Sequence, residues 1–299
     1  MTAAADAVRP RLPERLLLAY ARRFPIRRGK LRVVNALWRA AAGADRQRLA
    51  NLRCSDFRMS CDLEEMLQRQ FYFFGTYFLE KELLDAWAAA ARRARIIFDV
   101  GANSGIYALE ALAANPGASV HAFEPTPEIA ARLRQSVGLN RLDGRLHVHQ
   151  TAVSDQDGGA VLRRFRGETG DNEGMNYLVD EPSAPDDEVV ETVRLDRFCA
   201  ERGIGRIDLL KLDIQGREPE ALEGAGRLLA ERRIALIFME LNWGPRADCP
   251  ADRSIHRLGE AGYRFSAPGP NLEFRAPGDW LRRCSDVLAC APDLEGVGA

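Results

Sequence analysis

Residues 96–105, IIFDVGANSG, combine a short apolar run, an acid and two spaced glycines. The run around Asp99 is apolar on both faces, which is typical of a buried parallel strand. Gly101 and Gly105 permit backbone angles that other residues avoid, and they let the backbone approach a bulky ligand closely. The segment therefore predicts a buried strand followed by a ligand-binding turn.

A second acid follows the next apolar run. After the turn we expect a helix over SGIYALEALAA, capped by Asn103 or Ser104, and then a strand over residues 120–123 that ends at Glu124. In open α/β sheets, nucleosides bind at the carboxyl ends of the strands. An ionised carboxylate there can accept hydrogen bonds from both ribose hydroxyls. We therefore expect Asp99 and Glu124 to flank one cavity.

The spacing of the glycines separates two classes of nucleotide ligand. A dinucleotide oxidoreductase needs GxGxxG, with the pyrophosphate on a helix N-terminus, whereas this chain has Asn103 in place of the middle glycine. Asp99 stands two residues before the first glycine, where it disfavours a pyrophosphate. S-adenosylmethionine has an adenosine, a sulfonium and an ammonium but no phosphate, and it fits this charge. A nicotinamide-dependent oxidoreductase and a non-catalytic adenosine-binding scaffold stay open as alternatives.

Six segments of the chain resemble, in this order, the FkbM family of S-adenosylmethionine-dependent methyltransferases: FDVGANSG, AFEPTPE, TAVSD, VETVRLDRF, DLLKLDIQGREPEALEGA and IFMELN. The resemblance runs from about Phe71 to Pro292, and residues 211–218 are its most diagnostic part. It implies an α/β fold of the Rossmann-like class I methyltransferase type, with a mostly parallel seven-stranded sheet and an antiparallel C-terminal strand. It also implies methyl transfer, commonly to a hydroxyl of a sugar, glycolipid or natural product.

The resemblance and the strand ends together predict the site. The predicted cofactor-binding residues are Asp99, Gly101, Ala102, Asn103, Gly105, Glu124, Pro125, Ala152 and Val153. Asp213 is the predicted general base, and Lys211, two residues earlier on the same strand face, is expected to tune it electrostatically. In the structural alternative these two residues form only a strand-end ion pair. The segment GTYFLE, residues 75–80, is expected to roof the cofactor or acceptor pocket.

One position departs from the family pattern. The family usually has a glutamate where this chain has Gln215, in a DxEGxE pattern, although Asp213, Gly216 and Glu218 are kept. Any role that needs a second carboxylate at position 215 is therefore in doubt.

A divalent cation would suit the oxygen atoms of Asp213, Glu240 and Asn242. Because the sequence cannot establish that these side chains converge, no metal site is predicted. Three of the four histidines, His121, His147 and His149, are interpreted as strand residues, and His256 is the rival candidate for a base.

The charge of the chain is unevenly distributed. Residues 1–53 hold 13 Lys or Arg and three acids, a net charge of +10, which leaves −11 for the remainder. Two basic amphipathic helices are expected here, over ERLLLAYARRF and GKLRVVNALWRAAAG. They are compatible with peripheral contact to an anionic membrane, but packing of their apolar faces on the catalytic domain is favoured, because packed helices commonly carry charged outer faces. No nucleic-acid-binding motif is present, and no nucleic-acid partner is predicted.

Composition and cysteine spacing bear on the compartment of the protein, and the order of the segments predicts its domains. The 46% hydrophobic and 28% charged content is ordinary for a globular protein. The six cysteines form no CxxC pair, and there is neither an 18-residue apolar span nor a secretory segment, so a cytoplasmic protein is expected. We predict a basic, mainly helical extension over 1–94 that includes a hairpin over 49–62, a methyltransferase domain over 95–292 and a tail over 293–299. Residues 156–190 are expected to form an insertion beside the acceptor site. The oligomeric state is not predicted.

Overall fold

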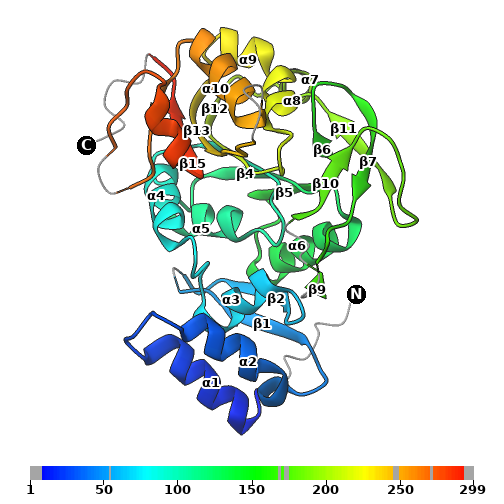
Figure 1. The fold of residues 1–299 in the computed structure, drawn as a ribbon, viewed down its shortest axis with the longest axis vertical. Coiled ribbons are helices and arrows are strands. Elements are labelled where there is room, and N and C mark those ends of the chain that lie inside the picture. The colour runs from blue at the N-terminus through cyan, green and yellow to red at the C-terminus, as the bar shows by residue number, and fades with distance from the viewer. Residues whose placement is uncertain are drawn as a thin grey trace.

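The computed structural model describes residues 9–292 except 54, 168–169, 172–174, 245–248 and 270–271; the predicted tail, 293–299, lies outside the described residues. A large α/β part occupies one end of the molecule, and a smaller part built from the N-terminal residues occupies the other (Figure 1). Within the described residues, no helix is both long and apolar enough to cross a membrane.

A seven-stranded sheet forms the centre of the α/β part. Its strands are β3 Ile96–Val100, β4 Ser119–Phe123, β5 Leu146–His149, β12 Ile207–Leu212, β13 Ile234–Glu240, β14 Arg264–Ser266 and β15 Asp286–Cys290. Their order is β14-β15-β13-β12-β3-β4-β5, and only β15 runs antiparallel to its neighbours. This is the Rossmann-like class I methyltransferase fold, as predicted. The strand order reverses between β3 and β12, which is where open α/β sheets bind ligands.

Helices cover both faces of this sheet (Figure 1). Two apolar cores lie between the helices and the strands. They are α5 Ile106–Ala114, α6 Pro127–Asn140, α7 Leu195–Glu201, α8 Glu218–Glu223, α9 Gly226–Ala230 and α10 Pro250–Glu260, and a 3-10 helix spans Asp279–Arg283. Successive strand residues point to opposite faces, so Ile97 enters the core that also contains α5, whereas Phe98 enters the core that also contains α7 to α10.

The predicted insertion is a small sheet rather than a plain loop. Its order is β10-β7-β11-β6, with β6 Ala152–Val153, β7 Gly158–Arg163, β10 Tyr177–Val179 and β11 Glu188–Val193. A short pair, β8 Arg166–Gly167 and β9 Gly170–Asp171, lies between β7 and β10 in the chain. The chain leaves the central sheet after His149, and β6 joins the small sheet by pairing with β11.

The N-terminal part consists of two helices, a hairpin and two further helices. These are α1 Leu12–Arg23, α2 Lys30–Ala42, β1 Gln47–Asn51, β2 Arg58–Asp62, α3 Met66–Phe74 and α4 Lys81–Ala91. The β1–β2 pair confirms the predicted hairpin. Trp87 of α4 makes edge contacts with Tyr107 and Phe238, so the N-terminal part and the central sheet share one core. The division of the chain at residue 94 stays a prediction.

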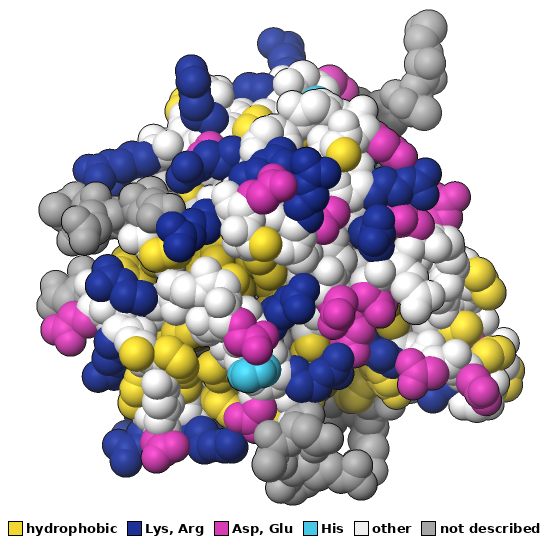
Figure 2. Space-filling view, turned by 90° about the horizontal axis from the view of Figure 1, so that it is seen from above, with side chains coloured by type: hydrophobic (Ala, Val, Ile, Leu, Met, Phe, Trp, Pro, Cys, Tyr) yellow, Lys and Arg dark blue, Asp and Glu magenta, His cyan; other side chains and the backbone are white. Residues whose placement is uncertain are grey.

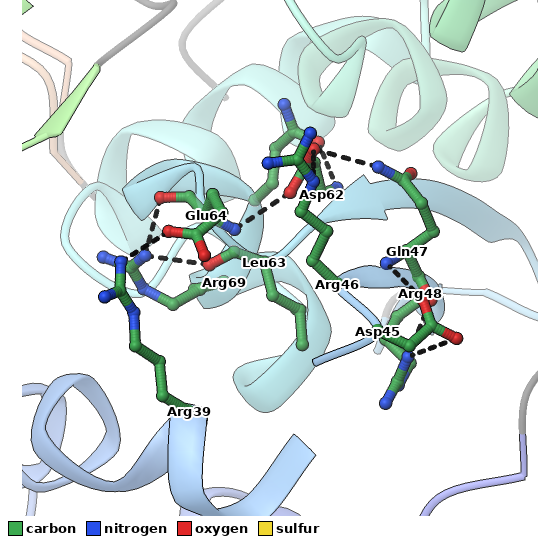
Figure 3. Close-up of polar contacts among 10 residues, drawn as sticks. Arg39, Asp45, Arg46, Gln47, Arg48, Asp62, Leu63, Glu64 and Arg69 are labelled. Carbon is green, nitrogen blue, oxygen red and sulfur yellow. Dashed lines mark hydrogen bonds and ion pairs between the residues drawn. The ribbon is translucent and has the colours of Figure 1, made fainter. Parts of the chain in front are cut away.

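Polar contacts join α2, the hairpin and α3 (Figure 3). Arg39 pairs with Glu64 at 2.6 Å, and Arg69 donates to the backbone carbonyl oxygens of Leu63 and Glu64. A fully buried pair, Arg48 with Glu14 at 2.7 Å, ties the hairpin to α1. These arginines therefore hold the N-terminal part together.

Candidate functional site

A cavity of about 560 Å³, counting the space at its open mouth, lies at the carboxyl ends of β3, β4 and β12. The lining comes from the turn after β3, the end of β4, the small sheet and the turn after β12: Val100, Gly101, Asn103, Phe123, Glu124, Pro125, Thr126, Thr151, Ala152, Val153, Leu162, Asn176, Tyr177, Leu178, Asp213, Ile214 and Gln215. The cavity thus sits at the predicted ligand-binding edge of the sheet.

The charged side chains of this lining are all acidic. It carries the carboxylates of Glu124 and Asp213, and among the described lining residues there is no Lys, Arg or His. Such a wall favours a cationic or neutral polar ligand and opposes an anionic one.

Glu124 is held rigidly in the cavity wall. Its Oε2 accepts a hydrogen bond from the backbone N–H of Asn103 at 3.0 Å, and its Oε1 accepts one from the backbone N–H of Thr126 at 2.8 Å. The residue is buried. One carboxylate therefore fixes both the turn after β3 and the start of α6.

The expectation that Asp99 and Glu124 flank one cavity was wrong for Asp99. Asp99 is 1% exposed and does not line the cavity. Side chains alternate along β3, so Asp99 points to the α5 face, where its strand neighbour is Lys211, while Val100 and Gly101 reach the cavity. Burial raises the pKa of Asp99 to about 6, although the Lys211 ammonium opposes the shift.

The two glycines of the turn were predicted to let the backbone approach a ligand, but the structure shows a different reason for the missing side chains. Both adopt positive φ, +79° at Gly101 and +85° at Gly105, as expected. A Cβ at Gly101 would lie 1.9 Å from the carbonyl oxygen of Asp213, and one at Gly105 would lie 2.3 Å from Leu133 Cδ1. The absent side chains therefore make room for the protein's own strand end and helix α6 rather than for a ligand.

Some of the other predicted cofactor-binding residues line the cavity, and others do not. Pro125, Ala152 and Val153 line the cavity, together with Asn103, whereas Ala102 and Gly105 do not. The predicted caps of α5 were wrong, because Gly105 occupies the N-cap position and no side chain caps the helix. The Asn103 side chain instead accepts hydrogen bonds from the backbone N–H and the hydroxyl of Ser104.

Lys211 and Asp213, the predicted catalytic pair, are in contact. Lys211 Nζ lies 2.7 Å from Asp213 Oδ2, and the ammonium also lies 4.4 Å from the centre of the Tyr107 ring. The Lys211 side chain is 6% exposed and that of Asp213 is 33% exposed, so only the carboxylate reaches the cavity. Burial opposes both charges, yet their attraction outweighs it: the pKa of Lys211 is raised and that of Asp213 is lowered. The pair is therefore ionised at neutral pH.

Gln215 connects Asp213 to a second acid. Its Nε2 donates to Asp213 Oδ1 at 3.1 Å and lies 3.3 Å from Glu240 Oε2, which also accepts from Asn242 Nδ2 at 3.0 Å. Gln215 adopts a left-handed φ of 57°, which an L side chain rarely takes. The predicted polar residues at the ends of β12 and β13 thus converge.

Glu240 differs from Asp213 in its protonation. Burial and the neighbouring Asp213 carboxylate together raise the pKa of Glu240 to about 8. Two nearby carboxyls rarely ionise together, so at neutral pH Glu240 holds a proton that it can donate toward Asp213. Within the described part of the chain, no group of three His, Cys, Asp or Glu side chains has the arrangement of a metal site.

Several cavity residues escaped the sequence analysis. Thr126, Asn176 and Tyr177 are polar lining residues, and Leu162 and Leu178 are apolar ones. Four of the five lie in or beside the insertion, where no motif marks them, and Thr126 could have been found from its place directly after AFEP. The insertion was expected beside the acceptor site, and it does border the cavity.

The segment GTYFLE, expected to roof the pocket, does not line the cavity. Glu80 accepts a hydrogen bond from the Tyr107 hydroxyl at 2.8 Å, and its charge acts on Lys211. Burial raises the pKa of Glu80. The segment therefore supports the Lys211 ammonium from below rather than roofing the cavity.

The histidines lie away from the cavity. His121 on β4 and His149 on β5 are 3.0 Å apart, from Nδ1 to Nε2, and His147 stacks on His121. As predicted, these three are strand residues. His256, the rival base, is exposed on α10, where it pairs with Glu260, and it is absent from the cavity lining.

Comparison with known proteins supplies independent information. The model of the family described as Methyltransferase FkbM domain matches residues 99–265, more than half of the chain. The 2-O-methyltransferase NoeI of Sinorhizobium fredii is 32% identical over 150 residues, 46% of this chain and 60% of that protein. The 31-O-demethyl-FK506 methyltransferase FkbM of Streptomyces tacrolimicus is 34% identical over 154 residues, 43% of this chain and 58% of that protein. The matches span about 60% of the length of these two relatives.

One solved structure is also similar in part. An O-methyltransferase from Bacillus cereus in complex with SAH aligns over 71% of this chain and 80% of that chain, with a TM-score of 0.39 and 12% identity.

Proposed function

Because the chain belongs to the FkbM methyltransferase family, we propose that it transfers a methyl group from S-adenosylmethionine to a hydroxyl oxygen of a sugar, glycolipid or natural product. The observation that carries the proposal is the charge of the cavity, which has two carboxylates and no basic side chain among its described lining residues. A sulfonium and an ammonium are favoured there, whereas the pyrophosphate of a nicotinamide dinucleotide would be repelled.

The cavity residues divide into two groups of roles. Glu124 would accept hydrogen bonds from the ribose hydroxyls, since its carboxylate lies in the cavity wall at the end of β4. Ala152 and Val153, which also line the cavity, would flank the adenine with their backbone. Asp99 is not a contact residue in this proposal, because it is buried behind the turn. Instead, Asp99 would support the catalytic pair, because its carboxylate favours the charged form of its strand neighbour Lys211.

Asp213 would act as the general base on the acceptor hydroxyl. Its ionised carboxylate reaches the cavity, and Lys211 and Gln215 fix its two oxygens. Bound S-adenosylmethionine would supply an activated methyl group, so alignment of the acceptor oxygen accounts for much of the expected acceleration. The hydrogen bond that the nearby Glu240 carboxyl can donate lowers the pKa of Asp213 further, so Asp213 would take the hydroxyl proton only as methyl transfer makes the acceptor oxygen more acidic.

The acceptor class follows the resemblance to the FkbM family, and the names of the two relatives support an oxygen acceptor. Both are O-methyltransferases by name, one described as a 2-O-methyltransferase and the other as acting on demethyl-FK506. We also propose that residues 95–292 form the catalytic domain and that the enzyme acts in the cytoplasm, in line with the free thiols of the five described cysteines.

Calorimetric titration and turnover test the proposal together. Wild type should bind S-adenosylhomocysteine and should not bind NAD, and turnover on a panel of glycan and polyketide hydroxyl acceptors should yield a product one methylene heavier. Asp213→Asn should keep S-adenosylhomocysteine binding but lower kcat about 10²-fold or more. Binding of NAD in place of S-adenosylhomocysteine would favour the oxidoreductase, and binding without turnover on any acceptor would favour the adenosine-binding scaffold.

A further inference from the structure

The helical hairpin formed by α1 and α2 exposes many apolar side chains. Nine large apolar residues are exposed in the described part of the chain, and six of them fall within residues 12–37: Leu12, Leu16, Phe24, Ile26, Val33 and Leu37. Leu12, Leu16 and Ile26 are each more than half exposed. A concentration of this kind marks an interaction surface, whereas single exposed apolar residues do not.

These side chains form stripes on the outward side of each helix. On α1, Leu12, Leu16 and Ala19 follow a spacing of four and three residues, and all are exposed. On α2 the exposed residues Val33, Ala36, Leu37 and Ala40 repeat the pattern. Residues at these spacings share one helix face.

The inward faces of the two helices are already occupied. Leu17 and Ala21 of α1, and Val34 and Trp38 of α2, are buried in the core of the N-terminal part. The sequence analysis favoured packing of the apolar helix faces on the rest of the protein. This packing accounts for the buried residues of α1 and α2 but not for their exposed apolar residues. We call the exposed apolar residues 12, 16, 19, 24, 26, 33, 36, 37 and 40, together with the exposed arginines 15, 23, 28 and 32, the outer face.

The surroundings of the outer face are strongly basic. Residues 9–42 contain ten Lys or Arg and one acid, Glu14, which is buried against Arg48. Arg15, Arg23, Arg28 and Arg32 are exposed and form no ion pair with any described residue. The helical hairpin of α1 and α2 lies at the end of the molecule opposite the central sheet (Figure 1). The far end shows basic and acidic side chains interleaved (Figure 2), so the helical hairpin differs from it in charge.

We propose that the outer face docks on an anionic membrane surface, with its apolar side chains in the headgroup region and its arginines on lipid phosphates. Amphipathic helices with arginines beside an apolar stripe bind membrane interfaces in this way, and each Lys or Arg near an anionic surface adds to the attraction. A second copy of the same face is disfavoured, because it would bring two sets of unpaired arginines together. A nucleic acid would leave the apolar stripes without a partner.

Vesicle flotation of the full chain tests the proposal. Wild type should bind vesicles of phosphatidylcholine with phosphatidylglycerol, should bind vesicles of phosphatidylcholine alone much more weakly, and should be released by high salt. Leu12→Ser/Leu16→Ser/Leu37→Ser should lower the partition coefficient at least about tenfold. Arg15→Gln/Arg23→Gln/Arg28→Gln/Arg32→Gln should lower it by a similar factor and remove the preference for anionic lipid.

Matched controls come from exposed residues elsewhere. Val189→Ser, at an apolar position that is 77% exposed, and Arg264→Gln/Arg283→Gln should bind vesicles like wild type. All variants should keep wild-type affinity for S-adenosylhomocysteine, because the outer face is far from the cavity. The proposal is overturned if both outer-face variants bind like wild type. It is also overturned if wild type is a dimer in solution that the leucine variant dissociates, since the face would then join two copies of the chain.

Discussion

The side-chain amide of Gln215 donates a hydrogen bond of 3.1 Å to Asp213, the predicted general base. The same nitrogen lies 3.3 Å from Glu240, so one neutral donor separates two carboxyls at the carboxyl ends of β12 and β13. A glutamate at position 215, usual in the family, would replace this donor by a third acid. The pairing of Gln215 with Asp213 therefore keeps the base ionised without a further positive charge.

Gln215→Glu should shift the acid limb of the pH profile of kcat/KM to higher pH. A third carboxylate raises the pKa of its neighbours, by about one unit for an unscreened contact. Gln215→Ala is the control, because it removes the hydrogen bonds without adding charge, and it should lower kcat with a smaller displacement of the limb. An unchanged limb in Gln215→Glu would mean that Asp213 does not titrate in the reaction. Adding magnesium to Gln215→Glu checks whether the extra acid creates a metal requirement.

Glu124→Gln should weaken S-adenosylhomocysteine binding about tenfold or more, since hydrogen bonds to a charged acceptor contribute about 1.5–3 kcal/mol. Titration calorimetry measures the loss. Glu128→Gln is the matched control: Glu128 is on the first turn of α6, is exposed and pairs with Arg164. Equal affinity in Glu124→Gln and wild type would remove Glu124 from the cofactor site.

Glu240→Gln should be more stable than wild type at alkaline pH. The folded pKa of Glu240, about 8, lies above its ordinary value of 4.5. The stability that this group contributes is therefore complete below pH 4.5 and is lost as the pH rises to 8. Glutamine cannot ionise, so the difference in Tm between variant and wild type should grow from pH 5 to pH 8. A constant difference would show that Glu240 titrates normally.

The histidine cluster should make the protein less stable in mild acid. Burial lowers the pKa of His121 to about 3 and that of His149 to about 4, and the neighbouring histidines and Arg202 add to both shifts. The unfolded chain then takes up protons from pH 6.5 downward while the folded chain does not, so stability is present above pH 6.5 and is lost as the pH falls toward 4.

Thermal denaturation across this range measures the effect. Tm should fall between pH 7 and pH 5 in wild type, and His149→Phe should flatten the fall, since its ring keeps the contacts with Phe123 and Phe198 without titrating. His256→Gln, at an exposed position on α10, should leave the slope unchanged. A wild-type slope in His149→Phe would contradict the assignment.

Local sequence was sufficient for the fold class, for most core strands and for the edge of the sheet that carries the site. Apolar runs such as residues 96–100 and 207–212 are buried whatever surrounds them, because each needs cover on both faces. The strand-end residues Glu124, Asp213 and Gln215 could be placed at one edge for the same reason, since the carboxyl ends of parallel strands meet there.

Only the tertiary structure decided which way each polar side chain points. Asp99 faces Lys211 rather than the cavity, because a one-residue change along a strand reverses the face. The glycine at 101 serves the backbone of Asp213, a neighbour more than a hundred residues away in the chain. Likewise, the basic N-terminal sequence predicted two amphipathic helices, but which apolar residues would be buried and which would be exposed depended on the packing of α1 and α2 against their neighbours. Periodicity within a segment is a local property, whereas the orientation of a side chain toward a partner depends on contacts between segments that are distant in the chain.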